Sequence, residues 1–174
     1  MTASLTIEQL TFEQAQLAIK DLAALLQDTV ESGAAVGFIP PLSCEDAHTY
    51  WAKTISDLSG ESRILLVARV NQEIAGAAQL ELAMRSNGRH RAEVQKVMVH
   101  RRFRQQGIGR ALMIAIEDAA RNAGRTLLVL DTRRGDTGEV LYRKLGYLRA
   151  GVIPNYALSA NGELHDTVIM YRQL

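Results

Sequence analysis

The sequence contains very little cysteine, little proline and almost no net charge. Cys44 is the single cysteine of the 174 residues, which excludes an internal disulfide bond and a multi-cysteine zinc cluster. A lone thiol with no base placed beside it is expected to be a small, partly buried residue. Only 3 prolines occur, and no stretch rich in proline, glycine or serine indicates a linker between domains. Lysine and arginine number 20 against 19 aspartates and glutamates, so no molecule-wide positive field favours nucleic acid or an anionic membrane as a partner. A basic site, if present, must be local.

Long apolar runs and metal-binding patterns are also missing. No apolar run approaches the roughly 18 residues that a membrane helix needs, and residues 1–12 lack a basic segment followed by an apolar one. We therefore expect a cytoplasmic protein. The 4 histidines show no H-x-x-x-H or related spacing, which predicts no metal site. With 47% hydrophobic and 22% charged residues, the composition suits one globular domain over residues 1–174.

Hydrophobic periodicity predicts helices and strands that alternate along the chain. Helical spacing and capping residues favour helices over residues 11–33, 43–60, 104–123 and 137–145. After a short apolar start at Leu5, β-rich runs predict strands over residues 63–70, 73–82, 92–99, 126–132, 147–156 and 165–172. The run 126–132 is continuously apolar, as in a strand buried on both faces. This order of elements predicts a mixed α/β sheet covered by helices.

A basic glycine turn between a strand and a helix carries the strongest chemical signal. Residues 97–110 read V-M-V-H-R-R-F-R-Q-Q-G-I-G-R, so that two glycines stand at the start of an amphipathic helix. Free N–H groups at such a helix start favour an anion, and glycine lets a phosphate approach the backbone. Positive charge is added by Arg101, Arg102, Arg104 and Arg110. Neither the P-loop nor the G-x-G-x-x-G pattern is present, so a diphosphate fits and a mononucleotide kinase is not expected. A turn merely shaped by glycines, beside solvated arginines, is the alternative.

This turn resembles a motif of the GNAT superfamily of acetyl-CoA-dependent N-acetyltransferases. R-Q-Q-G-I-G at residues 104–109 matches its Q/R-x-x-G-x-G/A pattern, and L-Y-R-K-L-G-Y at residues 141–147 is similar to its second signature. The order of elements resembles the superfamily's fold over nearly the whole chain. The resemblance implies a GNAT-type α/β fold: a mixed, largely antiparallel sheet with splayed central parallel strands, flanked by helices.

Three stretches are most similar to one group within the superfamily, the tabtoxin resistance acetyltransferases. They are A-E-V-Q-K-V-M-V at residues 92–99, T-V-E-S-G-A-A-V-G-F at residues 29–38 and D-T at residues 131–132. Because these stretches lie on the substrate side of the superfamily's fold, the likeness concerns the acceptor.

The resemblance implies where the cosubstrate acetyl-CoA binds. Its pantetheine arm would lie between the strands ending at Val99 and Thr132, paired with the backbone of Val97 and Val99 like a missing strand. The amides of residues 105–110 would hold the pyrophosphate. The coenzyme-binding residues expected on this basis are Val97, Met98, Val99, Arg104, Gln105, Gln106, Gly107, Ile108, Gly109, Arg110 and Tyr142.

Acetyl transfer to nitrogen needs a neutral amine, a donor to the developing oxyanion and a proton source for the leaving thiolate. Tyr142 corresponds to the superfamily's usual general acid; packing between helix and strand is its alternative role. Glu93 and Asp131 are candidates for taking the ammonium proton, directly or through water, and for binding a cationic substrate. Their alternatives are a surface or salt-bridged carboxylate for Glu93 and a cap of the following turn for Asp131. Which of the two is the base stays open.

The face on which Glu93 lies depends on the regularity of its strand. Strict alternation places it with Gln95, Val97 and Val99, whereas a bulge that the superfamily often carries here would re-aim it.

The resemblance places the acceptor pocket between residues 33–41 and the last hairpin. Phe38 and Tyr156 are expected in an apolar wall, joined by Trp51 unless its helical spacing places it in the core. His165 is the one histidine expected to enter this pocket, with a structural or exposed position as the alternative.

The sequence thus predicts an acetyl-CoA-dependent N-acetyltransferase acting by direct attack on a primary amine of a small molecule, amino-acid-like or antibiotic-like. A protein or peptide N-acetyltransferase and a catalytically silent acyl-CoA-binding module are the alternatives. A homodimer formed through the edge of the last hairpin is a further expectation.

Overall fold

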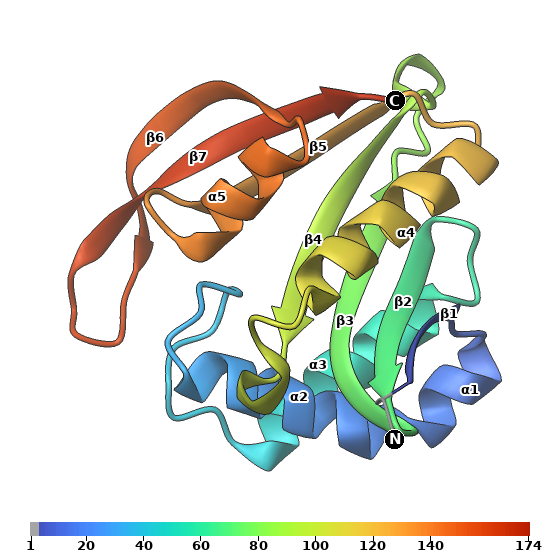
Figure 1. The fold of residues 1–174 in the computed structure, drawn as a ribbon, viewed down its shortest axis with the longest axis vertical. Coiled ribbons are helices and arrows are strands. Elements are labelled where there is room, and N and C mark those ends of the chain that lie inside the picture. The colour runs from blue at the N-terminus through green and yellow to red at the C-terminus, as the bar shows by residue number, and fades with distance from the viewer. Residues whose placement is uncertain (1–3) are drawn as a thin grey trace.

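One seven-stranded sheet organises the chain in the computed structural model, which describes residues 4–174 (Figure 1). Its strands are β1 (Leu5–Gln9), β2 (Arg63–Val70), β3 (Glu73–Leu82), β4 (Arg91–Val99), β5 (Leu127–Arg133), β6 (Leu148–Leu158) and β7 (Leu164–Gln173). They lie in the order β1-β2-β3-β4-β5-β7-β6. The pair β4 and β5 is parallel, and the other neighbouring pairs are antiparallel. The expected mixed, largely antiparallel sheet is confirmed.

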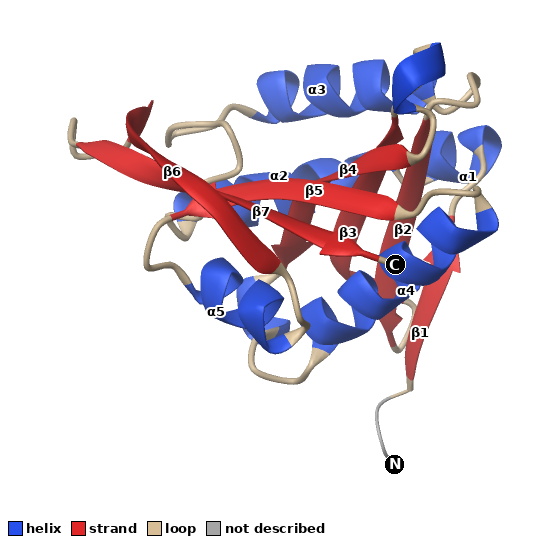
Figure 2. Cartoon of the chain, turned by 90° about the horizontal axis from the view of Figure 1, so that it is seen from above, coloured by secondary structure: helices blue, strands red, loops and turns tan. Residues whose placement is uncertain are grey.

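Helices cover both faces of the sheet. They are α1 (Phe12–Leu17), α2 (Ile19–Glu31), α3 (Cys44–Asp57), α4 (Ile108–Asn122) and α5 (Thr137–Lys144), with short 3₁₀ turns η1 (Ser86–Gly88) and η2 (Arg101–Phe103). Figure 2 shows α2 and α3 along one face and α4 and α5 along the other. Each face buries its own hydrophobic cluster, one centred on Leu22 and Trp51, the other on Leu112 and Ile116. Within residues 4–174, no helix is long and apolar enough to span a membrane.

The predicted helix over residues 11–33 is two helices. Thr11 and Gln14 form the expected capping box, in which each accepts a hydrogen bond from the other's backbone N–H. The chain then leaves the helix at Ala18, whose N–H is shared between the carbonyls of Gln14 and Ala15. Because Ala15, Ala18 and Leu22 are all buried, the apolar period continues across the break and gives no sign of it.

Three other expectations differ from the structure. The helix expected from residue 104 begins at Ile108, because Gln105 and Gly107 have left-handed φ values of 61° and 80° that a right-handed helix excludes. β5 is fully buried on one face only, through Leu128 and Leu130, because α5 covers that face alone. Cys44, expected to be a partly buried residue, is exposed because it is the first residue of α3.

The parallel strands β4 and β5 separate soon after they meet. Their pairing extends from Arg91 opposite Leu127 to Glu93 opposite Val129 and then stops. Beyond that point Figure 1 shows the two strands diverging, with the loop between α2 and α3 below the opening. The backbone groups that face the opening have no strand partner, so the splayed central strands expected from the sequence are confirmed.

Candidate active site

A bulge in β4 changes the face on which its side chains lie. Lys96 has a φ of 50°, and the register between β3 and β4 slips at this point. Ahead of the bulge, Ala92 and Val94 pack in the cluster beneath α4; after it, Val97 and Val99 pack against the same cluster. Without the extra residue, the two pairs would lie on opposite faces.

The bulge leaves Glu93 and Gln95 on the opposite face, towards α2 and α3. Met98, after the bulge, belongs to the cluster on that face. Glu93 therefore does not share a face with Val97 and Val99. The expectation from strict alternation is wrong, because the residue inserted at the bulge shifts the alternation by one position.

Glu93 belongs to a hydrogen-bonded network on the α3 face. The Gln95 side-chain amide donates to Glu93 Oε1 at 3.1 Å and to Glu81 Oε2 at 2.9 Å. Arg63 Nη2 in turn donates to Glu81 Oε2 at 3.1 Å. Glu93 is exposed and makes no ion pair among residues 4–174, so its carboxylate keeps oxygen lone pairs that no protein group uses.

The buried side of this network was not expected from the sequence. Gln79 is fully buried on β3, where its oxygen accepts from Arg63 Nη1 at 2.7 Å and its nitrogen donates to the Tyr50 hydroxyl at 2.9 Å. A glutamine inside the apolar run of β3 is a sequence signal that could have revealed it. Tyr50 also contacts Phe38 edge-on, with ring centroids 5.3 Å apart, and so joins the network to the loop 33–41.

Asp131 ends the buried part of β5. It is exposed, and its Oδ2 lies 3.1 Å from the hydroxyl of Thr167 on β7, so the bond made by its side chain runs to the neighbouring strand and not to a cap of the following turn. Its negative charge acts on two other groups. It adds to the rise in the pKa of Tyr142 that burial causes, and it raises the pKa of Lys96, which burial lowers. Asp131, Tyr142 and Lys96 therefore interact electrostatically across the opening.

Tyr142 is 8% exposed and lies in the cluster beneath α4, its ring centroid 5.9 Å from that of Tyr147. Burial first, and then the negative charges of Asp131 and Asp136, raise its pKa well above the ordinary value of 10.0. Like an ordinary tyrosine, it carries its phenol proton at neutral pH, and the raised pKa extends the protonated range above pH 10. Gly138 packs beside the ring, and a Cβ there would lie 3.4 Å from Tyr142 Cε2 but only 3.0 Å from Thr132 Oγ1, which is the tighter contact.

The glycine turn opens α4 as expected. Gly107 is the N-cap of the helix, and no heavy atom lies within 4 Å of the place where its Cβ would be. The space beside Gly107 is therefore free, and the N–H groups at the start of a helix, which lack partners within the helix, suit a bound anion. Gly109 has a different neighbourhood: a Cβ there would lie 3.3 Å from Leu141 of α5, so this glycine also serves the packing of the two helices.

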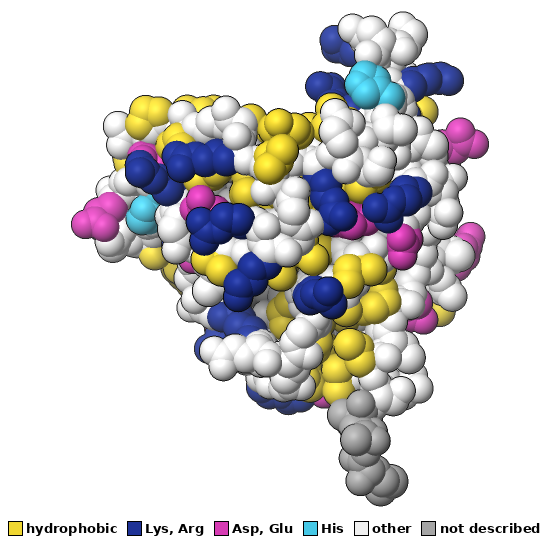
Figure 3. Space-filling model, turned by 45° about the horizontal axis from the view of Figure 1, so that its top comes forward, with side chains coloured by type: hydrophobic (Ala, Val, Ile, Leu, Met, Phe, Trp, Pro, Cys, Tyr) yellow, Lys and Arg dark blue, Asp and Glu magenta, His cyan; other side chains and the backbone are white. Residues whose placement is uncertain are grey.

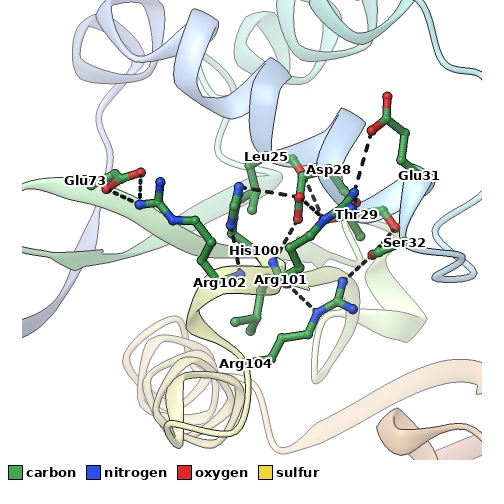
Figure 4. Close-up of polar contacts among 11 residues, drawn as sticks. Leu25, Asp28, Thr29, Glu31, Ser32, Glu73, His100, Arg101, Arg102 and Arg104 are labelled. Atoms are coloured by element: carbon green, nitrogen blue, oxygen red, sulfur yellow. Dashed lines mark hydrogen bonds and ion pairs between the residues drawn. The ribbon is translucent and has the colours of Figure 1, made fainter.

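The arginines of the turn are engaged within the protein (Figure 4). Arg101 pairs with Asp28 and Arg102 with Glu73, the latter at 2.7 Å. Arg104 Nε donates to the Val99 carbonyl at 3.1 Å, and its Nη2 bonds Ser32 Oγ at the end of α2. Within the described chain only Arg110, which is exposed, makes no ion pair or hydrogen bond through its side chain among these four.

Of the other residues expected to bind coenzyme, some can offer only their backbone and others have exposed side chains. Val97 and Val99 present backbone to the opening between β4 and β5. Met98 and Ile108 bury their side chains in the core, so only their backbone is available. Gln105 and Gln106 are exposed on the turn, where Gln106 Nε2 donates to the Arg102 carbonyl.

The aromatic and histidine residues expected in the acceptor pocket are not all together. Phe38 lies against Tyr50, as described above. Trp51 is fully buried on the inner side of α3, so of its two expected positions the one in the core is confirmed. Tyr156 is 56% exposed on β6, and His165 bonds Ser159 within the same hairpin.

Residues 32–33 connect the loop 33–41, called the acceptor loop below, to the ends of both splayed strands. Ser32 Oγ accepts a hydrogen bond from Arg104 Nη2, in the turn after β4. The Gly33 carbonyl accepts one from Arg133 Nη1, at the end of β5, at 3.3 Å. Within residues 4–174, no group of three or more His, Cys, Asp or Glu side chains could hold a metal ion.

Comparisons with known proteins agree with this arrangement. Residues 22–147 match the model of the acetyltransferase (GNAT) family. An uncharacterized N-acetyltransferase encoded in the hisH-hisA intergenic region of Azospirillum brasilense is 34% identical over 117 residues, covering 66% of this chain and 68% of that protein.

Solved structures share the fold at low identity. An acetyltransferase structure from Salmonella typhimurium, determined with its cofactor acetyl-CoA, has a TM-score of 0.77 at 20% identity and covers 98% of this chain and 94% of that one. A ribosomal-protein-alanine N-acetyltransferase from Brucella melitensis has a TM-score of 0.77 at 23% identity, over 97% of this chain and 99% of that one. Because the family model spans well over half of the sequence and the fold agrees, the chain belongs to the GNAT family of acetyltransferases.

Proposed function

We propose that the protein transfers the acetyl group of acetyl-CoA to a primary amine of a small molecule by direct attack on the thioester. The observation that carries this proposal is the separation of β4 from β5 beyond Glu93, directly beside the open turn at Gly107. The backbone of Val97 and Val99, which has no partner on β5, suits the amides of a pantetheine arm, although the Val99 carbonyl also accepts from Arg104 Nε. The N–H groups at the start of α4 suit its pyrophosphate.

The proposed chemistry assigns one proton transfer to each side of the opening. The amine nitrogen forms the new bond to the acetyl carbon while the carbon–sulfur bond breaks, and the Tyr142 phenol gives its proton to the leaving thiolate. Glu93 or Asp131 accepts the ammonium proton, directly or through water. Support comes from the position of Tyr142 on α5, near the negative charge of Asp131 at the end of β5, and from the exposure of the Glu93 and Asp131 carboxylates.

The acceptor we propose is amino-acid-like or antibiotic-like. Two observations support a small acceptor: the loop 33–41 covers part of the α3 face through the contact of Phe38 with Tyr50, and both ends of the opening are tied to residues 32–33. The likeness of residues 29–38 and 92–99 to the tabtoxin resistance acetyltransferases supports the same class. A cytoplasmic location and a homodimer through the β6 edge stay predictions; exposed Tyr156 and Leu158 on β6 support the latter.

The first experiment measures thiol release from acetyl-CoA with amino acids, amino-acid-like toxins, polyamines, aminoglycosides and short peptides, with coenzyme binding followed in parallel. We expect release with small amines that carry an amino-acid group. Thiol release with peptides alone would mean that the acceptor is a peptide and not a small molecule. Coenzyme binding without any thiol release would favour a silent acyl-CoA-binding module. No binding of coenzyme would overturn the proposal.

A further inference from the structure

Lys96 is a half-buried cation that lacks an anionic partner beside the candidate acceptor site. It occupies the bulge of β4, and its side chain takes part in none of the ion pairs or hydrogen bonds among residues 4–174. A half-buried ammonium normally finds a carboxylate, because burial without one costs free energy. The three N–H donors of the Lys96 ammonium therefore have no hydrogen-bond acceptor among residues 4–174.

The Lys96 ammonium lies on the side of the sheet that α3 and the loop 33–41 cover. Lys96 Nζ lies 5.8 Å from the centroid of the Tyr50 ring, and a Cβ on Gly37 would lie only 3.3 Å from it. Gly37 has a φ of +84°, so the acceptor loop bends around the ammonium at a residue without a side chain. Residues 32–41 contain no acidic side chain to neutralise it.

The charges that act on Lys96 come from both sides of the opening. Burial lowers its pKa, Asp131 and Glu93 oppose this, and Arg63 adds to the lowering. Arg63 already has Glu81 as a partner at 3.1 Å. The site thus combines two carboxylates suited to an ammonium group with one lysine suited to an anion, and a ligand bearing both groups complements it.

We propose that Lys96 binds a carboxylate of the acceptor and thereby selects amines that also carry a carboxylate, such as amino acids. This proposal rests on the proposed function, because it names the acceptor class of the same site. A purely structural lysine would be paired within the protein. A lysine that served the proton transfer would act on every amine alike, with or without a carboxylate.

The test compares each amino acid accepted in the panel with its α-amide, which keeps the amine and removes the negative charge. We expect the wild-type protein to show a kcat/KM for the acid at least tenfold above that for the amide, in the range of a charged hydrogen bond. Lys96→Met should remove this preference mainly through KM, and Lys96→Arg should restore part of it. Lys53→Met, on the exposed side of α3, is the matched control and should keep the preference.

Equal losses of kcat/KM for acid and amide in Lys96→Met would overturn the proposal, as would a wild-type protein without preference. In either case turnover of amines would leave the proposed function standing. Thermal unfolding of each variant shows that it has folded, and none of the changes alters the positive φ at the bulge.

A second measurement does not depend on turnover. Calorimetry of the complex with coenzyme A, titrated with N-acetyl amino acids and with the matching N-acetyl amides, measures recognition of the carboxylate alone. Tighter binding of the acids, lost in Lys96→Met and kept in Lys53→Met, supports the carboxylate subsite even if no amine of the panel is acetylated. Equal binding of acids and amides overturns it.

Discussion

At the scale of single residues, Tyr142 joins a packing role to a chemical one. Replacing it by Phe keeps the buried ring and removes the proton donor. We expect Tyr142→Phe to lower kcat by about 10² or more, the usual size of general acid catalysis, while the affinity for coenzyme A changes little. Steady-state thiol release and calorimetry measure the two quantities.

Tyr147→Phe is the matched control, since its ring is buried beside that of Tyr142 and it has no assigned part in the transfer. Its kcat should stay near that of the wild-type protein. If Tyr142→Phe turned over as fast as this control, another group would have to protonate the thiolate.

The candidate acid and the two candidate carboxylates came from motifs in the sequence, and their roles stay predictions. Gln79 carried a signal in its apolar surroundings that the sequence analysis did not use, whereas Lys96 carried none. The position of Lys96 beside Tyr50 depends on the bulge, and a positive φ at a lysine leaves no mark in the residue pattern. Trp51 shows the reverse difficulty: its spacing fits both a pocket wall and a core, and only the packing of α3 decides between them.

At the scale of elements, the start of α4 depends on the left-handed conformation of Gly107. An Ala at this position meets no neighbouring atom but must adopt a φ of 80°, which costs about 1–2 kcal/mol for most residues. We expect Gly107→Ala to lower the free energy of unfolding by about 1 kcal/mol and to weaken coenzyme binding. Urea denaturation and calorimetry measure these effects.

Gly107→Asn is the informative comparison, because asparagine enters the left-handed region more easily than alanine. It should be less destabilising than Gly107→Ala. Equal losses of stability for the two variants would mean that backbone conformation is not what the glycine provides.

The boundaries of elements were predictable where a cap or turn residue marks them. The hairpin between β2 and β3 turns at Asn71 and Gln72, as expected, and Ser43 caps α3. The break at Ala18 was not predictable, because no Gly or Pro marks it and the apolar period runs through it. The splay of β4 and β5 came from the resemblance alone, since strand sequences do not reveal where pairing ends.

At the scale of the whole molecule, the charges balance in total, with 20 lysines and arginines against 19 aspartates and glutamates. On the face that Figure 3 shows, Lys and Arg side chains are spread over the surface, with Asp and Glu side chains near some of them. At the glycine turn, Asp28 and Glu73 neutralise two of the four arginines. Binding of a diphosphate there relies on backbone N–H groups more than on a basic surface.

Two buried tyrosines predict how the stability of the molecule depends on pH. Burial raises the pKa of both Tyr142 and Tyr147 above the ordinary value of 10.0. Above that pH the unfolded chain loses phenol protons that the folded chain keeps, so the free energy of unfolding falls as the pH rises. Each tyrosine contributes a slope of at most about 1.4 kcal/mol per pH unit, and below pH 10 neither contributes one.

Urea denaturation between neutral pH and pH 11 measures this slope. The double variant with Phe at positions 142 and 147 should have a flatter profile above pH 10 than the wild-type protein. An identical slope in both proteins would contradict the assignment to these two tyrosines.

The hydrogen bonds to residues 32–33 link the angle between β4 and β5 to the position of the loop 33–41. Arg104 and Arg133 fasten one short piece of chain to both arms of the V formed by β4 and β5. A change in the angle between β4 and β5 would therefore have to move residues 32–33 or break one of these two hydrogen bonds.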